Sequence, residues 1–281
     1  MTNASMPLTG PGSQPDEDDV VLDYMQMPQG MTTYHMPALP EPSKARDLSA
    51  ALAKLDEVLL ALNHWKPGHT GLFVDLAGLD AANRAFIDEV LGEGEVSIVA
   101  GSNLQIQEAV LAGVWRVRVL ADDGALVKDT IEVGSIPAVV HEAAFASANV
   151  GVRSPDGLSA DGLLASPSLL AEVHNVLVGG QGDDATHSIN LSLLPHTEED
   201  LVFLDQQLGA GHVHILSRGY GNCRISSTTT RNVWWVRYFN SQDTLILNSI
   251  EVARIPEVAF AAVEDIHDSA QRLSEILDVY R

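Results

Sequence analysis

The sequence predicts an α+β protein made of two tandem pseudo-symmetric repeats, each with the element order α-β-α-β-β-β-α and with mixed β-sheets. Internal duplication is the main observation: FIDEVLGEGEVSI (86–98) reappears as FLDQQLGAGHVHI (203–215), shifted by 117 residues with seven of thirteen positions identical. Later, IEVGSIPAV (131–139) reappears as IEVARIPEV (250–258), shifted by 119 residues. Because the order of the segments is kept, we expect two copies of one structural unit.

The repeats and the segments around them divide the chain into four parts. They are an arm (1–45), a first repeat (46–150), a linker (151–165) and a second repeat (166–281). The arm contains all six methionines and many prolines and has no helical or strand period. This composition predicts a mobile, disordered segment. Met25, Met27 and Met31 also suit docking on a partner's groove, because methionine side chains adapt to irregular apolar surfaces.

The first repeat is expected to begin with a helix. Leucines recur at spacings of four and three from Leu48 to Leu62, which is the period of one helix face, and Asp47 is a suitable N-cap. A short strand is expected at 71–76, followed by a helix that ends at Gly92, since glycine readily adopts the conformation that ends a helix. These elements form the α-β-α part of the unit.

Three strands and a helix complete the first repeat. The strands are expected at 95–110 with a break, at 113–120 and at 125–134. Asp123-Gly124 is a typical hairpin turn between the last two strands. The closing helix is expected from Pro137, because proline is tolerated in the first helical turn.

The second repeat carries the same signals. Its first helix is expected to start at Ser166-Pro167, its short strand spans 187–193, and its next helix follows Thr197 and ends at Gly209. Thr197 and the acidic residues after it form a capped helix start. A helix from Pro256 is expected to close the copy. The sequence leaves open whether the two repeats share one sheet.

The chain carries 38 acidic and 16 basic residues, a formal net charge of -22. This charge opposes binding to nucleic acid and anionic membranes and favours a basic partner. The sequence has no apolar run of about 18 residues and no signal peptide, so we expect a cytoplasmic protein without stable membrane insertion. Its one cysteine, Cys223, excludes an internal disulfide and cannot by itself hold a four-cysteine zinc or iron–sulfur site.

The two copies differ most where AGSNLQIQEAVLAG (100–113) becomes SRGYGNCRISSTTTRN (217–232). The second copy has arginine and aromatic residues here, in an otherwise acidic chain. Arginine suits recognition of carboxylates and carbonyls, and aromatic residues are enriched at interface hot spots. The candidates for binding a client protein are Arg218, Tyr220, Arg224, Arg231, Trp235 and Arg237. Trp234 is expected in the core, like Trp115 in the first copy, whereas Trp235 should face the other side of its strand.

Cys223 is a possible redox residue, because nearby arginines would lower the pKa of its thiol. His212 and His214 share a strand face at the spacing of a metal pair, but two imidazoles do not complete a site. A buried structural thiol and hydrogen-bonded structural histidines are the alternative interpretation. No P-loop, GxGxxG, HExxH or GxSxG motif occurs. We therefore assign no catalytic residue, metal ligand or cofactor, and expect no enzymatic activity.

The stretch RGYGNCRISSTTTRNVWWVRYFNSQDTLILNSIEVARIPEVA (218–259), with GPGSQ (10–14) and the Met-Pro arm, resembles the HupH/HyaF/HoxQ family of hydrogenase expression proteins. The resemblance runs over essentially the whole chain. It implies a cytoplasmic accessory protein for the maturation of uptake [NiFe]-hydrogenases, particularly in the presence of oxygen. It also implies two partners: the precursor of the iron–sulfur small subunit, with its twin-arginine export signal, and a thioredoxin-like protein of the HupG/HyaE/HoxO type.

Two functional classes follow from these observations. The preferred class is a chaperone or scaffold that binds the immature small subunit before export and supports its assembly in the presence of oxygen. A scaffold that assembles clusters would have to borrow ligands from a partner, because Cys223 alone is insufficient. The alternative class is a redox or metal-handling enzyme that uses Cys223 and nearby histidines.

Overall fold

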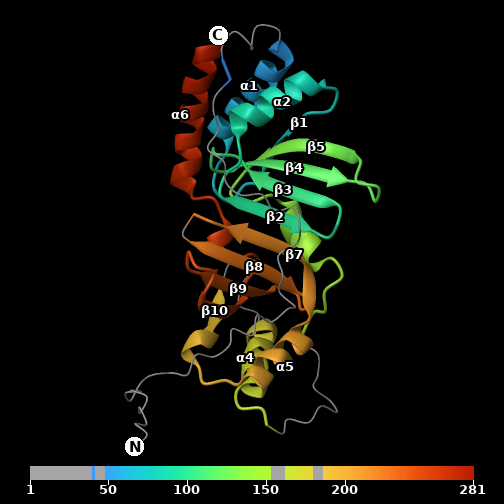
Figure 1. The fold of residues 1–281 in the computed structure, drawn as a ribbon, viewed down its shortest axis with the longest axis vertical. Helices are drawn as coiled ribbons and strands as arrows, with labels where there is room; N and C mark the ends of the chain where they lie inside the picture. The colour runs from blue at the N-terminus through green and yellow to red at the C-terminus, as the bar shows by residue number, and fades with distance from the viewer. Residues whose placement is uncertain (1–39, 42–47, 153–161, 180–185, 220) are drawn as a thin grey trace, which may run out of the picture.

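The computed structural model describes residues 40–41, 48–152, 162–179, 186–219 and 221–281 (Figure 1). Four of the predicted site residues, Met25, Met27, Met31 and Tyr220, lie outside this described part, as does the predicted cap Asp47. The arm (1–45), which was predicted to be mobile, also lies almost entirely outside the described residues.

The described residues form both helices and strands, as expected for an α+β protein. The helices are α1 (Ser49–His64), α2 (Ala81–Leu91), α3 (Val139–Phe145), α4 (Ser166–Val178), α5 (Glu198–Leu208) and α6 (Val263–Tyr280). The strands are β1 (Leu72–Asp75), β2 (Val96–Ala100), β3 (Leu104–Glu108), β4 (Val114–Leu120), β5 (Leu126–Val133), β6 (His187–Asn190), β7 (Ala210–Ser217), β8 (Asn222–Thr228), β9 (Val233–Phe239) and β10 (Leu245–Val252). Short 3-10 turns, η3 (Leu191–Leu193) and η4 (Glu257–Ala259), follow β6 and β10. No helix in the described ranges is both long and apolar enough to cross a membrane.

Local signals set the ends of α2 and α5 as predicted. Both helices stop at a glycine with positive φ, Gly92 at 56° and Gly209 at 68°, a backbone region that favours glycine. At the start of α5, Thr197 and Asp200 form a reciprocal capping box. Asp80 caps α2 by accepting a hydrogen bond from the Asn83 backbone at 2.8 Å.

All ten strands join in one sheet, in the order β1-β5-β4-β3-β2-β7-β8-β9-β10-β6. Each neighbouring pair of these strands is antiparallel, so the prediction of mixed sheets was wrong. Consecutive strands are joined mainly by short turns, which connect antiparallel neighbours without a crossover helix. The two halves meet at β2 and β7, where Ile98 lies opposite Ile215. The sheet is thus continuous across both predicted repeats.

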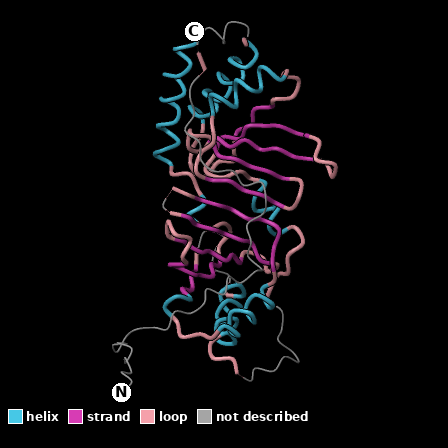
Figure 2. The backbone as a smooth tube through the Cα atoms, viewed as in Figure 1, coloured by secondary structure: helices cyan, strands magenta, loops and turns pink. Residues whose placement is uncertain are grey.

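The two faces of the sheet are covered differently. One face, here called the helix-bearing face, packs against α1, α2 and α6 at one end and against α4 and α5 at the other. Figure 1 shows these two groups of helices at opposite ends of the long axis, and Figure 2 shows the strands between them. The other face packs against α3. Since side chains alternate along a strand, each strand contributes to both layers.

Three clusters of buried apolar side chains correspond to these layers. Two clusters lie on the helix-bearing face, one at each end of the sheet. The third lies under α3 and combines residues of both halves, including Ile98, Ile215 and Trp234. Trp234 is fully buried, as predicted, and its indole nitrogen donates to the Ala253 carbonyl at 3.1 Å. The halves therefore share a core, which is not what two separately packed units would give.

The C-terminal helix α6 packs on the half that it does not follow in sequence. The helix predicted from Pro256 is only the turn η4, after which the chain crosses to cover α1. Leu273 and Leu277 are almost completely buried against α1 and α2, and the rings of Tyr280 and Phe86 meet edge to face. The Tyr280 hydroxyl also donates to the Pro40 carbonyl at 2.9 Å. Burial of this apolar stripe explains why α6 lies there.

Candidate functional site

The middle of the helix-bearing face is polar and lies between α2 and α5. We call it the central face and define it by the side chains that β3, β2, β7 and β8 direct to this side. They include Gln105, Val99, His214 and Arg224, all of which are partly or fully exposed. The pairing of Val99 with His214 makes this surface continuous across the two halves. A strand-borne polar surface of this kind is a rigid platform for contacts with another molecule.

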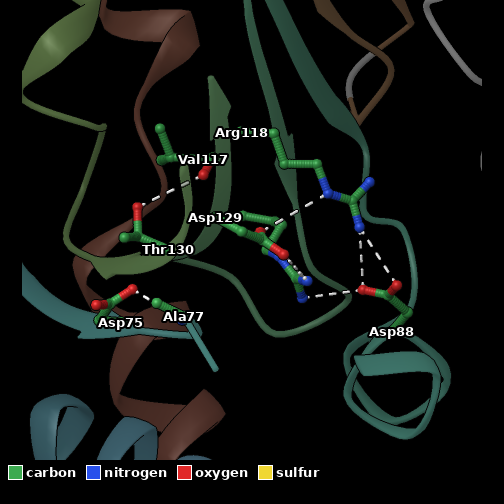
Figure 3. A network of polar contacts seen from close by, with 8 residues as sticks. Asp75, Ala77, Asp88, Val117, Arg118, Asp129 and Thr130 are labelled. Atoms are coloured by element: carbon green, nitrogen blue, oxygen red, sulfur yellow. Dashed lines mark hydrogen bonds and ion pairs between the residues drawn. The ribbon is translucent and has the colours of Figure 1, made fainter. Parts of the chain in front are cut away.

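One edge of the central face, which we call the first bank, is a network of four charged side chains. Arg116 on β4 makes a two-pronged contact with Asp129 on β5, and its Nη2 donates to Asp129 Oδ2 at 2.7 Å. Arg116 Nη1 also lies 2.9 Å from Asp88 Oδ1 on α2. Arg118 reaches the same Asp88 at 3.1 Å (Figure 3). The network therefore ties α2 to the sheet.

Burial makes this network important for stability. Arg116 and Asp129 are 7% and 6% exposed, whereas Asp88 and Arg118 are more accessible. Two-pronged arginine–carboxylate pairs are among the stronger hydrogen-bonded contacts, but a buried charge left without its partner costs about 3–5 kcal/mol. Beside the network is a recess of about 160 Å³, lined in part by Gly92, Gln107 and Arg118. The network thus holds one wall of this recess in a fixed geometry.

The opposite edge of the central face, which we call the second bank, has the same strand register, but the side chains at the equivalent positions are chemically different. Trp235 on β9 donates through its indole nitrogen to Asn248 Oδ1 on β10 at 2.5 Å. The guanidinium of Arg237 lies 4.9 Å from the centroid of a Trp235 ring. On α5, burial raises the pKa of Asp205, and the charge of Arg237 partly offsets this effect. The second bank is therefore a Trp–Asn pair stacked beneath an arginine.

Two predicted contact residues are buried in this bank. Trp235 does face away from Trp234, as strand alternation predicted, but it is 2% exposed and packs in the core beneath α4 and α5. Arg237 is 8% exposed. The predicted contact residues are therefore buried in this structure, because alternation gives the face of a side chain but not what covers that face. They lie beside the central face, on β9 next to β8.

Arg224 remains accessible on the central face. Its side chain is 31% exposed, lies 4.2 Å from the centroid of the Phe239 ring and pairs with Asp243 at 3.1 Å. Arg231 is exposed but lies at the other end of the β8–β9 hairpin, where its backbone bonds to Asn149. Arg218 follows the end of β7. Arg224 and Arg237 lie directly opposite each other on β8 and β9, and Arg218 comes two residues after Leu216, the β7 partner of Arg224, so the fold sets only Arg231 apart from the other predicted arginines.

Cys223 and the histidines lie on opposite faces of the sheet. Cys223 is 2% exposed in the core under α3, where burial raises the pKa of its thiol to about 12. His214 faces the central face, with Nδ1 3.1 Å from Ser226 Oγ, and burial lowers its pKa. A redox or metal site that combines Cys223 with His214 does not fit this arrangement. Within the described residues, no cluster of three histidine, cysteine or carboxylate side chains has metal-binding geometry.

The charged network and a buried carboxylate were not predicted from the sequence. The network joins residues far apart in sequence, and its only advance signal was the presence of charged residues on an otherwise apolar strand. Glu108 is 7% exposed, and burial raises the pKa of its carboxyl to about 7. It accepts a hydrogen bond from the Gly113 backbone at 3.2 Å, with the charge of Glu95 nearby. Nothing in the spacing of these residues predicted that burial.

Comparisons with known proteins agree with the resemblance seen in the sequence. A family model described as "HupH hydrogenase expression protein, C-terminal conserved region" matches residues 48–148 and 163–280. The hydrogenase expression/formation protein HoxQ of Cupriavidus necator is 47% identical over 272 residues, covering 96% of this chain and 95% of that protein. HupH of Rhodobacter capsulatus is 49% identical over 277 residues, with 97% and 96% covered.

More distant similarities are also found. The hydrogenase-1 operon protein HyaF of Escherichia coli K12 is 36% identical over 286 residues, covering 98% of this chain and 96% of that protein. A solved structure of the hydrogenase expression protein HupH from Thiobacillus denitrificans matches with 30% identity and a TM-score of 0.35, over 39% of this chain and 92% of that one.

Proposed function

Because the chain belongs to the HupH family of hydrogenase expression proteins and has a role in hydrogenase maturation, we propose that it acts as a chaperone. Its client is the immature iron–sulfur small subunit of an uptake [NiFe]-hydrogenase, held in the cytoplasm before export. Holding this client supports its assembly in the presence of oxygen. The observation that carries the proposal is the central face, a polar surface at the middle of a rigid ten-stranded sheet.

The central face suits binding better than catalysis. Its accessible groups, Gln105, His214 and Arg224, offer hydrogen-bond donors and acceptors to a polypeptide. Beside them, the buried pair Arg116–Asp129 holds the neighbouring strands β4 and β5 together. A preorganised surface loses less conformational entropy when it binds a partner. The central face is thus the part of the molecule best suited to hold a client.

Charge supports the choice of client. The chain has a net charge of -22, which favours association with a basic segment. A small-subunit precursor with a twin-arginine export signal presents such a segment. A thioredoxin-like protein of the HupG/HyaE/HoxO type is the proposed second partner. Raising the ionic strength should weaken precursor binding, because screening reduces attraction between exposed charges.

We also propose that the two halves are copies of one duplicated unit. Their strand orders mirror each other about β2 and β7. Arg118 lies opposite Asp129 in one half, and Arg237 lies opposite Asn248 in the other, at positions that differ by 119 residues. The corresponding registers support a common origin for the two half-sheets.

The redox or metal-handling alternative has weaker support. Its thiol, Cys223, is buried and has a raised pKa, whereas reactive cysteines are partly exposed thiolates. Cys223→Ser tests the alternative directly in cells that make the hydrogenase. Normal hydrogenase activity in this variant would exclude the thiol mechanism. Loss of activity with precursor binding retained would favour it over the chaperone.

The chaperone is tested by purifying the protein from cells that make the hydrogenase. Mass spectrometry should detect the small-subunit precursor with its signal peptide attached. Arg224→Glu on the central face should reduce the recovered precursor about tenfold, the loss expected for a contact worth about 1.4 kcal/mol. Arg231→Glu is the matched control, because it makes the same charge change on the same hairpin but away from the central face.

Two results would count against the proposal. If wild-type protein recovers no precursor, the client is wrong. If Arg224→Glu and Arg231→Glu recover as much precursor as the wild type, the precursor binds elsewhere on the molecule.

A further inference from the structure

Two histidines lie two positions apart on β7, in the middle of the sheet. His212 is exposed and His214 is partly exposed. Val213 and Ile215, which alternate with them, are fully buried in the core under α3. Side chains alternate along a strand, so both imidazoles are directed to the opposite side, which carries the central face. Burial lowers the pKa of His214 and the charge of His212 lowers it further, because the two rings are close to each other.

Ser226 orients the ring of His214. The two residues are direct partners on β7 and β8, and His214 Nδ1 lies 3.1 Å from Ser226 Oγ. When Nδ1–H donates to this hydroxyl oxygen, Nε2 keeps its lone pair on the other side of the ring. A metal-ligating histidine usually has its second ring nitrogen bonded in this way, which fixes the tautomer and the orientation of the ring. Since burial also favours the neutral imidazole, which is the form that binds metal, His214 is suited to act as a ligand through Nε2.

The first repeat lacks this arrangement at the equivalent positions. Ser97 and Gln107 precede His214 and Ser226 by 117 and 119 residues, the two shifts of the repeat, and they also lie opposite each other. The Gln107 amide nitrogen donates to three backbone carbonyls at 3.0 to 3.2 Å. Glu95 stands in place of the first histidine. Because the same strand pair forms in the first repeat without imidazoles, the fold does not require them, and they are an addition to the second repeat.

We propose that His212 and His214 bind a divalent transition-metal ion such as Zn²⁺ on the central face. Imidazole nitrogen suits zinc, copper and nickel, and two residues at this spacing direct their rings to the same side of a strand. Among the described residues no third histidine, cysteine or carboxylate joins the pair, so water or a group of a partner fills the remaining coordination positions. Such an open site differs from the closed four-ligand site of a structural zinc. The inference does not rest on the proposed client, because the purified chain alone tests it.

The test titrates Zn²⁺ into the full chain by isothermal titration calorimetry near neutral pH. His212→Asn and His214→Asn should each weaken binding at least tenfold, because a single imidazole cannot chelate the ion. Ser226→Ala keeps both ligands but removes the partner of Nδ1, and it should weaken binding about tenfold, as loss of such partners does in metal sites. Circular dichroism and thermal unfolding check that each variant is folded.

A matched control separates the pair from general metal binding by histidine. His174→Asn makes the same substitution at an exposed position of α4 and should leave the affinity for Zn²⁺ within about twofold. Absence of Zn²⁺ binding to the wild-type chain would overturn the proposal. Unchanged affinity in both His212→Asn and His214→Asn, or an equal loss with His174→Asn, would overturn it as well, because the ion would then bind elsewhere. Unchanged affinity in Ser226→Ala would contradict the role of Ser226 in orienting His214.

Discussion

The two banks of the central face place different chemistry on the same backbone register. Arg116 donates to Asp129 between β4 and β5, and Trp235 donates to Asn248 between β9 and β10. All four side chains are buried. The sheet therefore needs a hydrogen-bonded pair at this position, because a buried polar group without a partner is costly, but the pair does not have to be ionic. In the first bank the charge of Arg116 also makes an ion pair with Asp88 on α2.

This difference also predicts how much stability each bank loses when one of its residues is substituted. An ionic pair that loses one member leaves a buried charge, whereas a neutral pair leaves only a buried dipole. Substitutions in the first bank should therefore be more destabilising than equivalent substitutions in the second.

Asp129→Ala should have the largest effect on stability. It leaves Arg116 buried with only the partly exposed Asp88 as counter-charge, so the free energy of unfolding should fall by about 3–5 kcal/mol in urea titrations. The double substitution Arg116→Trp with Asp129→Asn copies the second bank into the first and should restore most of the loss. A double variant as unstable as Asp129→Ala would mean that the banks are not interchangeable.

Glu108 offers a second comparison, because Ser227 holds the same place opposite a core tryptophan in the other half. The folded-state pKa of Glu108, about 7, exceeds its ordinary value of 4.5. The native state therefore binds the proton more tightly, and stability should decrease as the pH rises from about 4.5 to 7. Glu108→Gln should remove this decrease and be about 3 kcal/mol more stable than wild type at pH 8.

Unfolding titrations at several pH values check this prediction. The two proteins should be similar near pH 4, where the carboxyl is protonated in both folded and unfolded wild type. An unchanged pH dependence in Glu108→Gln would show that another group is responsible.

Trp235→Phe should have a smaller effect than loss of Asp129. It removes the indole donor and leaves the Asn248 amide oxygen buried without this partner, at a cost of about 1–3 kcal/mol. Adding Asn248→Leu should recover part of the cost, because both polar partners are then gone. Thermal unfolding of the single and double variants measures this recovery, and a further loss in the double variant would contradict it.

Arg224→Gln should have the smallest effect on stability. Its ion pair with Asp243 is exposed, and such pairs contribute at most about 1 kcal/mol. The urea midpoint should move little, and Arg231→Gln should serve as an equally mild control. A large loss of stability would show that Arg224 is a structural residue and would remove it as a contact candidate.

Much of the local structure could be predicted from the sequence, because its signals are short-range. Gly92, Gly209 and Thr197 ended or began helices where expected. Long-range pairing was not predictable in the same way. Nothing local indicates that β2 will pair with β7 or that α6 will cross to α1.

The candidate site was predicted less well for the same reason. Alternation correctly turned Trp235 away from Trp234, but its burial depends on helices from elsewhere in the chain. Arg224 was identified as a contact candidate and is accessible, although its use by a client is still to be tested. The Asp88 contacts join a helix to a strand 28 and 30 residues away in sequence, and only the folded chain brings them together.

The junction of β2 and β7 has the form of an isologous dimer interface. Ile98 lies opposite Ile215, and these residues differ by 117 positions, the shift that relates the repeated segments. Each strand therefore offers the other the same edge, as two identical subunits do across a twofold axis. Covalent linkage makes this contact independent of protein concentration. It also hides two strand edges that separate half-molecules would expose to aggregation.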